Sequence, residues 1–205
     1  MIHSVEALRA DIDSLCAIEP ALAAALRRLD YPEPRVRAAG YETLLRTIVG
    51  QQVSVAAAAA VWNRLEALLD TGCPPDHLLS QSEEALRACG LSRQKQGYAR
   101  SLAELVLSGE VDLHALPADD EEAIDLLVRI KGIGRWSAEI YLLFAEGRPD
   151  IWPAGDLAIR IAVGQLLDMP DRPSEKQTRD IAERWRPYRS AAALFAWHHY
   201  NGATL

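Results

Sequence analysis

The sequence predicts an all-α protein. Apolar residues recur at three- and four-residue intervals along most of the chain, and the helix-favouring residues Ala, Leu, Arg and Glu dominate its composition. No run of alternating polar and apolar residues is long enough to predict a strand. Because 49% of the 205 residues are hydrophobic and 25% are charged, the chain can fill one large core or two small helical lobes.

The first half of the chain contains six predicted helices, separated by turn-forming residues. Pro20 suits the first turn of the second helix, and the Tyr31-Pro32-Glu33-Pro34 and Gly72-Cys73-Pro74-Pro75 segments are predicted loops. The run Ala56–Ala60 lacks large side chains and predicts a close contact between helices. The six predicted ranges are Val5–Cys16, Glu19–Leu29, Tyr41–Ile48, Val53–Leu69, Ser82–Cys89 and Ser92–Ser108.

The second half continues the helical pattern. Acidic residues open the first of these helices, where the positive end of the helix dipole favours them. A loop from Gly147 to Gly155 separates the second predicted helix from the third. The five predicted ranges are Asp119–Ile130, Trp136–Ala145, Asp156–Leu167, Glu175–Trp185 and Ser190–His199.

Composition and residue spacing exclude several classes of function. Three scattered cysteines are too few for a disulfide framework or an Fe–S cluster held within this chain, and the five histidines lack metal-ligand spacing. No stretch is apolar enough to span a membrane and the N-terminus lacks a signal-like core, so we expect a cytoplasmic protein. The net charge of −7 argues against binding to nucleic acid driven by charge alone, although a small surface can be locally positive.

A glycine-containing turn joins two predicted helices at Lys131-Gly132-Ile133-Gly134. Glycines at both ends permit backbone conformations closed to other residues and leave the backbone N–H groups uncovered. With a helix starting near Arg135, these donors can face one anion, such as a DNA phosphate. Ile133 is expected to anchor the turn in the core. An ordinary turn between two helices could contain the same glycines. The surrounding sequence is therefore needed to distinguish such a turn from one that binds a phosphate.

Three blocks of the sequence carry a recognisable pattern over about residues 40 to 200. The blocks are Leu127–Ala138 followed by Pro153 and Asp156, then Ile48–Ser54, and Trp185–Ser190 followed by Trp197 and Tyr200. This pattern resembles the helix-hairpin-helix (HhH-GPD) superfamily of DNA glycosylases, with the strongest likeness to the 3-methyladenine DNA glycosylase II type. We do not expect the N-terminal β-rich domain of the longer members here.

The resemblance implies two helical lobes that flank an active-site cleft. Lobe A would contain about residues 1–38 and 150–205, and lobe B about residues 39–149 with the hairpin 131–134. It also implies a monomer that acts on double-stranded DNA with alkylated bases and meets the nucleoid during repair. The sequence leaves open whether a structural Na⁺ or K⁺ binds the backbone of Val128, Ile130 and Ile133, as a monovalent cation does in relatives.

Asp156 matches the catalytic aspartate of the superfamily. Cleavage of an N-glycosidic bond builds positive charge on the sugar, and a fixed carboxylate stabilises that charge and can orient water. An aspartate directly before a helix is also a typical N-cap, and the two roles are compatible. Asp150 and Asp168 are alternative acids, and both are expected to be solvated.

Trp136 occupies the position where lyase-competent relatives carry the lysine that attacks the sugar. The resemblance therefore implies a monofunctional enzyme that uses water as its nucleophile. Trp136 and Trp197 match aromatic residues of the family's base pocket, with Tyr141 or Tyr200 nearby, and electron-rich rings favour a cationic alkylated purine. Each of these aromatic residues is also a reasonable core residue. In some longer members, tyrosines replace Ile140 and Leu157, which leaves the base preference of this pocket open.

The remaining predicted contacts concern the DNA duplex. Gln52, with Gln51 beside it, matches the side chain that fills the gap left by a flipped base, although polar residues are also common at helix starts. Lys131, Gly132, Ile133, Gly134 and Arg135 are the predicted backbone contacts, with Arg129 and Arg189 as further candidates.

Two alternatives to alkylated-purine excision stay open. One is a glycosylase for another lesion, such as hypoxanthine or uracil, because the shape of the pocket decides that choice. The other is a non-catalytic DNA-binding module that uses the hairpin only to hold the DNA backbone. Retention of Asp156 and of the aromatic blocks, together with the acidic net charge, argues against the second alternative.

Overall fold

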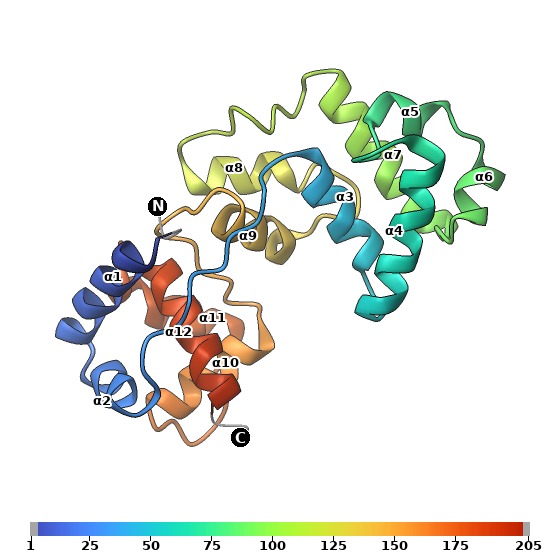
Figure 1. The fold of residues 1–205 in the computed structure, drawn as a ribbon. Coiled ribbons are helices and arrows are strands. Elements are labelled where there is room, and N and C mark those ends of the chain that lie inside the picture. Colours follow the sequence, from blue (N-terminus) through green and yellow to red (C-terminus); the bar gives the residue numbers. More distant parts are fainter. Residues whose placement is uncertain (1–3, 203–205) are drawn as a thin grey trace. The chain divides into compact units, whose positions relative to one another are not determined.

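The computed structural model describes residues 4–202 and confirms the all-α prediction, with no strand in this part of the chain (Figure 1). Eleven of the elements correspond to the predicted helices, with ends that differ by a few residues. The elements are α1 Val5–Ile18, α2 Pro20–Leu29, α3 Tyr41–Gly50, α4 Val55–Leu69, α5 Pro75–Ser80, α6 Glu83–Ala88, α7 Arg93–Leu107, α8 Asp120–Leu127, α9 Arg135–Phe144, α10 Leu157–Leu166, α11 Glu175–Ala182, the 3-10 helix η1 Glu183–Trp185 and α12 Arg189–Gly202.

The chain divides into two compact units. Unit 1 consists of Met1–Val36 and Glu139–Leu205, and unit 2 of Arg37–Ala138. The first boundary lies near the predicted position of about residue 38. The second lies inside α9, whereas the sequence placed it in the loop near residue 150, because α9 is one uninterrupted helix whose C-terminal turns are buried with unit 1.

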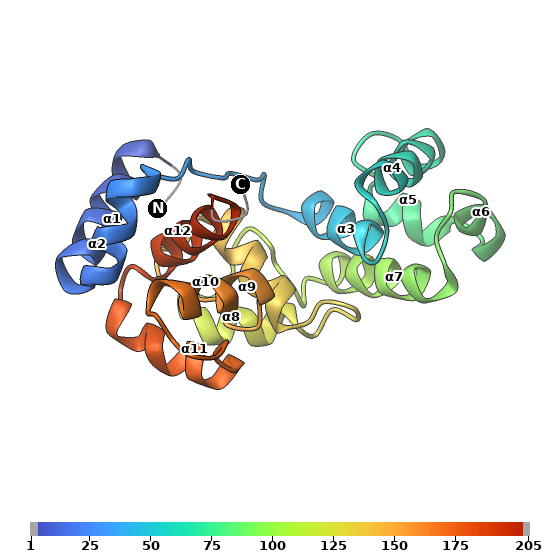
Figure 2. The same ribbon diagram turned by 90° about the horizontal axis from the view of Figure 1, so that it is seen from below.

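Unit 1 is built around α12, which packs against α1, α2 and α10 (Figures 1 and 2). Its first two turns are buried on every side from Arg189 to Ala196, which explains the small residues in this stretch. The helices α1 and α2 form a pair, and their core positions are Leu8, Ile12, Leu15 and Leu22, each at most 2% exposed. Side-chain caps begin three of the helices of this unit, namely Ser4 for α1, Asp156 for α10 and Ser174 for α11.

Unit 2 is built around α7, which packs against α3, α5 and α6. The helices α4, α6 and α7 begin at the serines Ser54, Ser82 and Ser92, whose hydroxyls accept backbone N–H groups of the first turn. The helix α5 was not predicted, since its first residue, Pro75, belongs to the segment predicted as a loop and it lacks a serine cap like that of the equally short α6.

The prediction for the alanine run in α4 is wrong. Ala56, Ala57, Ala59 and Ala60 are exposed, and only Ala58 is half-buried. The small side chains therefore do not mark a close contact between helices within this unit. The buried side of α4 begins further along the helix, at Trp62 and Leu65.

Two charged residues near the start of α12 are more buried than the sequence suggested. The Asp150 side chain is 14% exposed and accepts hydrogen bonds from Arg186 (2.6 Å) and Arg189 (2.8 Å). Arg189 is itself 8% exposed and also donates to Glu183. The predictions that Asp150 is solvated and that Arg189 contacts DNA are therefore wrong, because the two residues satisfy each other inside unit 1.

No helix within residues 4–202 combines the length and the hydropathy needed to cross a lipid bilayer.

Candidate active site

The hairpin between α8 and α9 depends on one glycine rather than two. Gly132 has a φ of +84°, and a Cβ added there would lie 2.2 Å from the Tyr98 ring. Only glycine fits both the backbone conformation and this close approach. Gly134 has no positive φ and no atom within 4 Å of an added Cβ, so the prediction that both glycines are conformationally required is wrong for Gly134.

Backbone groups hold the hairpin in place on unit 2. Ile133 is 3% exposed, as the sequence predicted, and its N–H donates to the Ile130 carbonyl at 3.0 Å. The Lys131 N–H donates to the Ser101 hydroxyl of α7 at 3.2 Å. A monovalent cation at the hairpin would therefore share the Ile130 oxygen with a backbone N–H. In the described part of the chain, no cluster of three or more His, Cys, Asp or Glu side chains is arranged to hold a metal.

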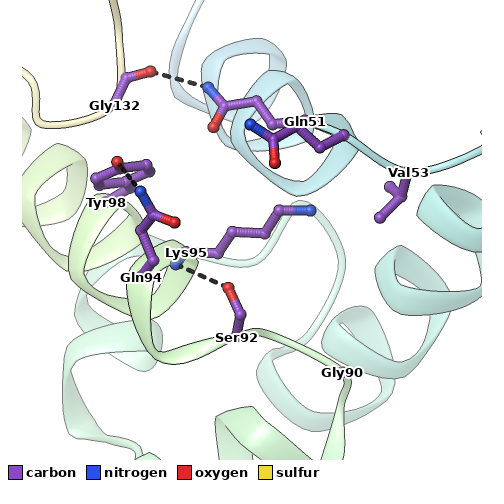
Figure 3. Close-up of a pocket in the computed structure, with 9 residues that line it drawn as sticks. Gln51, Val53, Gly90, Ser92, Gln94, Lys95, Tyr98 and Gly132 are labelled. Carbon is purple, nitrogen blue, oxygen red and sulfur yellow. Dashed lines mark hydrogen bonds between the residues drawn. The ribbon is translucent and has the colours of Figure 1, made fainter.

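The loop after α3 separates the two glutamines that the sequence grouped together. Gln51 is half-buried, and its Nε2 donates to the Gly132 carbonyl at 2.8 Å, which joins the loop to the hairpin (Figure 3). Gln52 is exposed and has a φ of +56°, in the left-handed region that non-glycine residues rarely adopt. Of the two, Gln52 therefore has the side chain that is available to a ligand.

A pocket of about 310 Å³ opens beside this loop and the hairpin, entirely within unit 2 (Figure 3). Sequence reasoning missed its contribution from the start of α7, since nothing in the sequence joins that segment to the loop after α3. No acidic side chain lines it, and Lys95 supplies a positive charge. The lining residues are Gln51, Gln52, Val53, Gly90, Ser92, Gln94, Lys95, Tyr98 and Gly132.

The carboxylate of Asp156 accepts hydrogen bonds from a backbone group and a side chain of unit 1. Its Oδ1 accepts the Ile159 N–H, which caps α10, and the indole Nε1–H of Trp197, each at 3.1 Å. The Trp197 ring stacks on Phe144, with ring centroids 5.5 Å apart and planes at 27°. The N-cap role proposed from the sequence is thus confirmed, and both donors fix the direction of the carboxylate.

The loop that leads to Asp156 is anchored on α11 and η1. Trp152 is 2% exposed, donates its Nε1–H to the Thr178 carbonyl at 3.1 Å and meets the Trp185 ring edge-on at 5.3 Å. At the end of the loop, Gly155 lies against Glu175, whose Oε2 would be 3.5 Å from an added Cβ. These contacts place Asp156 on a rigid support rather than on a free loop.

The predicted base-pocket aromatics differ widely in exposure. Trp136 on α9 is 47% exposed, whereas Tyr141 is 3% exposed and belongs to the core, which contradicts its prediction as a pocket residue. Trp197 and Tyr200 on α12 are half-buried. Trp197 also has a contact that the sequence did not predict, because its N–H is donated to Asp156.

The predicted basic contacts near the hairpin are mostly paired with acids. Arg129 forms an ion pair with Glu110, and Arg135 bonds both carboxylate oxygens of Glu121, at 2.6 and 2.8 Å. Lys131 is exposed. Lys131 and the N-terminal end of α9 are therefore the principal means of binding an anion on this side of unit 2.

The remaining rival acid does not resemble Asp156. Asp168 is exposed and has a φ of +49° just after α10. Of the three candidate acids, Asp150 is paired with arginines and Asp168 is exposed, whereas Asp156 is half-buried and accepts an indole N–H.

These features define a class of helical protein that has both a glycine-containing helix-hairpin-helix turn, of the kind that binds DNA phosphates, and a carboxylate held in a fixed direction. Within that class, the chain belongs to the HhH-GPD superfamily of base excision DNA repair proteins, whose family model matches residues 45–187.

Individual relatives agree with this membership. The chain is 36% identical to DNA-3-methyladenine glycosylase 1 of Schizosaccharomyces pombe, over 77% of this chain and 71% of that protein. The crystal structure of a DNA-3-methyladenine glycosidase from Bacillus halodurans superimposes with a TM-score of 0.88 at 29% identity, over 95% of this chain and 90% of the other. The S. pombe 3-methyladenine DNA glycosylase, solved in complex with abasic DNA, superimposes with a TM-score of 0.77 at 30% identity, over 96% and 97%.

Proposed function

We propose that this chain is a monofunctional DNA-3-methyladenine glycosylase of base excision repair. It hydrolyses the N-glycosidic bond of alkylated purines, 3-methyladenine and 7-methylguanine, and leaves an abasic site in double-stranded DNA. The observation that carries the proposal is the Asp156 carboxylate, held by the Trp197 indole and by the first turn of α10 in a chain of this superfamily.

The fixed carboxylate suits a reaction that develops positive charge on a sugar. As the glycosidic bond breaks, its electron pair leaves with the base and the deoxyribose becomes an oxocarbenium-like cation. A negative group held in place before the reaction stabilises that cation without reorganising. Asp156 also accepts, directly or through solvent, the proton lost by the water that adds to C1′.

The charge of the substrate explains why one carboxylate suffices. An alkylated purine such as 3-methyladenine is cationic in DNA and becomes neutral when it takes the bond electrons, so it leaves without being protonated. Uracil and hypoxanthine start neutral and leave more readily if an acid protonates them. The exposed Trp136 ring offers a stacking surface that favours a cationic base by about 0.5–2 kcal/mol.

The absence of a lysine at position 136 supports hydrolysis over lyase chemistry. A tryptophan cannot form a Schiff base with the sugar, so water is the nucleophile. Borohydride is therefore expected to trap no covalent complex with DNA, and a robust trapped adduct would refute the monofunctional assignment.

DNA binding is proposed to use unit 2. The pocket beside the loop after α3 has no acidic lining, and the hairpin leads into the N-terminal end of α9 next to the exposed Lys131. We assign Gln52 as the side chain that enters the duplex when the base flips out, and we expect a monomer to bind one lesion.

The proposal is tested by measuring base release over a panel of duplexes. Each duplex carries one 3-methyladenine, 7-methylguanine, hypoxanthine or uracil, and released bases are quantified at enzyme excess. We expect rapid release of the two methylated purines and release of the neutral bases slower by tenfold or more. Preferential release of uracil or hypoxanthine would support the other-lesion alternative, and binding with no release of any base would support a non-catalytic module.

A further inference from the structure

We infer that Lys95 and Gln51 are positioning residues that brace the loop carrying Gln52, so that this loop and the hairpin act on DNA as one rigid body. The inference rests on the proposed function, since it concerns how that loop enters the duplex. It assigns a role to Lys95 other than contact with a DNA phosphate.

The loop needs external support because its own backbone is unfavourable. Gln52 has a φ of +56°, a conformation that costs a non-glycine residue of the order of 1 kcal/mol and persists only where neighbours enforce it. Gln52 is also exposed, so its side chain makes little of the packing that would hold it. The residues that hold this conformation must therefore contact the chain just before Gln52 or join it to the neighbouring hairpin.

Lys95 supports the segment before the loop. Its Nζ donates to the carbonyl of Val49 at 2.7 Å, in the last turn of α3, where carbonyl groups lack helical partners. A cation at this end of a helix also offsets the negative end of the helix dipole. Figure 3 shows the Lys95 side chain extended from α7 toward the loop that carries Gln51 and Val53.

The environment of Lys95 agrees with a structural contact rather than a solvated one. The residue is half-buried in a segment whose neighbours Ser92, Arg93 and Gln94 are exposed. Burial lowers the pKa of its ammonium group. A lysine that serves only to attract phosphate would be expected to keep its ammonium in water.

Gln51 supports the loop from the hairpin side. Its Nε2 donates to the Gly132 carbonyl at 2.8 Å, and Gly132 is packed against the Tyr98 ring of α7. The Tyr98 hydroxyl in turn accepts a hydrogen bond from Gln94. The loop, the hairpin and the first turns of α7 are thus linked by side-chain contacts at Val49 and Gln51, both just before Gln52 and all inside unit 2.

The test uses Lys95→Met and Gln51→Leu, which keep most of the side-chain volume but remove the donors, with Lys95→Arg as the conservative variant. Lys176→Met and Gln165→Leu, at exposed positions of α11 and α10, are the matched controls. Each folded variant is titrated with a duplex that contains a tetrahydrofuran abasic site next to 2-aminopurine, whose fluorescence rises when a side chain enters the helix. Binding constants are measured in parallel over a range of salt concentrations.

We expect Lys95→Met and Gln51→Leu each to lower the ratio of inserted to non-inserted complex about tenfold, the size of one hydrogen bond to a charged or strained group. The salt dependence of binding stays unchanged, and Lys95→Arg restores insertion. Normal insertion by either folded variant would overturn the brace at that residue. A loss of about one unit of salt slope in Lys95→Met, with insertion intact, would make Lys95 a phosphate contact instead.

The readout does not depend on which base the protein excises. If the lesion panel showed no release of alkylated purines, the proposed function would fail while the insertion measurement still tested the brace. If Gln51→Leu fails to fold, Gln51→Glu, which keeps a polar side chain but removes the donor to Gly132, carries its test. If Lys95→Met fails to fold, Lys95→Gln, which keeps a polar side chain but removes the charged donor to Val49, carries its test. We expect each replacement to lower insertion about tenfold, and normal insertion would overturn the brace at that residue.

Discussion

The contacts at the carboxylate site of unit 1 and at the hairpin surface of unit 2 hold different things in place. In unit 1 they fix one side chain: Asp156 accepts hydrogen bonds from the Trp197 indole and the Ile159 N–H, and a buried tryptophan anchors the loop before it. In unit 2, side chains fix the backbone: Tyr98 lies against Gly132, and Gln51 and Lys95 each donate to a carbonyl. Under the proposed function, catalysis therefore depends on the direction of one charged group, whereas DNA binding depends on the backbone shape of two turns.

The largest effect of a single substitution is expected at Gly132, in the hairpin of unit 2. Gly132→Ala places a methyl group 2.2 Å from the Tyr98 ring, at a φ of +84°, so either the ring or the hairpin must move. We expect a loss of about 3 kcal/mol in the free energy of unfolding, together with a large loss of DNA affinity. Gly134→Ala is the matched control, because an added Cβ meets nothing within 4 Å there. Equal unfolding midpoints in urea for the two variants would contradict the account of the hairpin.

In unit 1 the corresponding change is Trp197→Phe. It keeps an aromatic ring against Phe144 but removes the N–H that holds Asp156 at 3.1 Å. Loss of a hydrogen bond to a charged group corresponds to about 2 kcal/mol, or a roughly thirtyfold lower kcat. We expect KM to change little. Phe144→Leu removes the stacked ring and keeps the donor, so its kcat should fall less. A larger kcat loss for Phe144→Leu would mean that stacking, not the hydrogen bond, is what matters at Trp197.

A smaller effect is expected from a charge at the edge of the hairpin. Lys131 is exposed, so Lys131→Met should weaken binding about threefold at every DNA sequence and reduce the salt slope by about one. The total slope should be shallow, since Arg129 and Arg135 are paired with acids. Fluorescence anisotropy titrations between low and moderate salt measure both quantities. A slope unchanged by the substitution would show that Lys131 does not contact phosphate.

The smallest predicted effect concerns stability rather than DNA. His199 is 8% exposed, and burial, with the nearby Arg28 and His198, lowers its pKa below the ordinary value. The unfolded chain therefore binds a proton more readily than the folded one, so this contribution to stability is complete above about pH 6.5 and falls as the pH drops through that value. His199→Leu should lose about 2 °C less in Tm than the wild type between pH 7.5 and 5.5. Parallel Tm curves would contradict this assignment.

The sequence predicted the helices and their order well because amphipathic repeats and caps are local signals. It missed α5, which begins at a proline and lacks a side-chain cap, and it misjudged the alanines of α4, whose exposure depends on neighbours distant in sequence. It also treated Asp150 as solvated and Arg189 as a DNA contact, although the two residues pair inside unit 1. Isolated charges look alike in a sequence, and only the fold shows which of them meet.

The candidate site was predictable where the family pattern marks it and unpredictable where contacts are long-range. Asp156 was predicted as the catalytic carboxylate, which stays a prediction, and the N-cap role named beside it is confirmed. The donation from Trp197, the contact of Tyr98 with Gly132 and the reach of Lys95 to Val49 join segments that no local pattern connects. Tyr141 was misassigned because a core aromatic and a pocket aromatic have the same helical spacing.

The central claim is that the charge of Asp156 drives base release. Asp156→Asn isolates that charge, because asparagine is an equally good N-cap and its carbonyl can still accept the Ile159 and Trp197 N–H groups. The direct measurement is the single-turnover rate of 3-methyladenine release, with binding to an abasic duplex measured alongside. We predict a rate lower by about 10²–10³-fold and an affinity within about threefold of the wild type. Release at the wild-type rate by the folded variant would contradict the account.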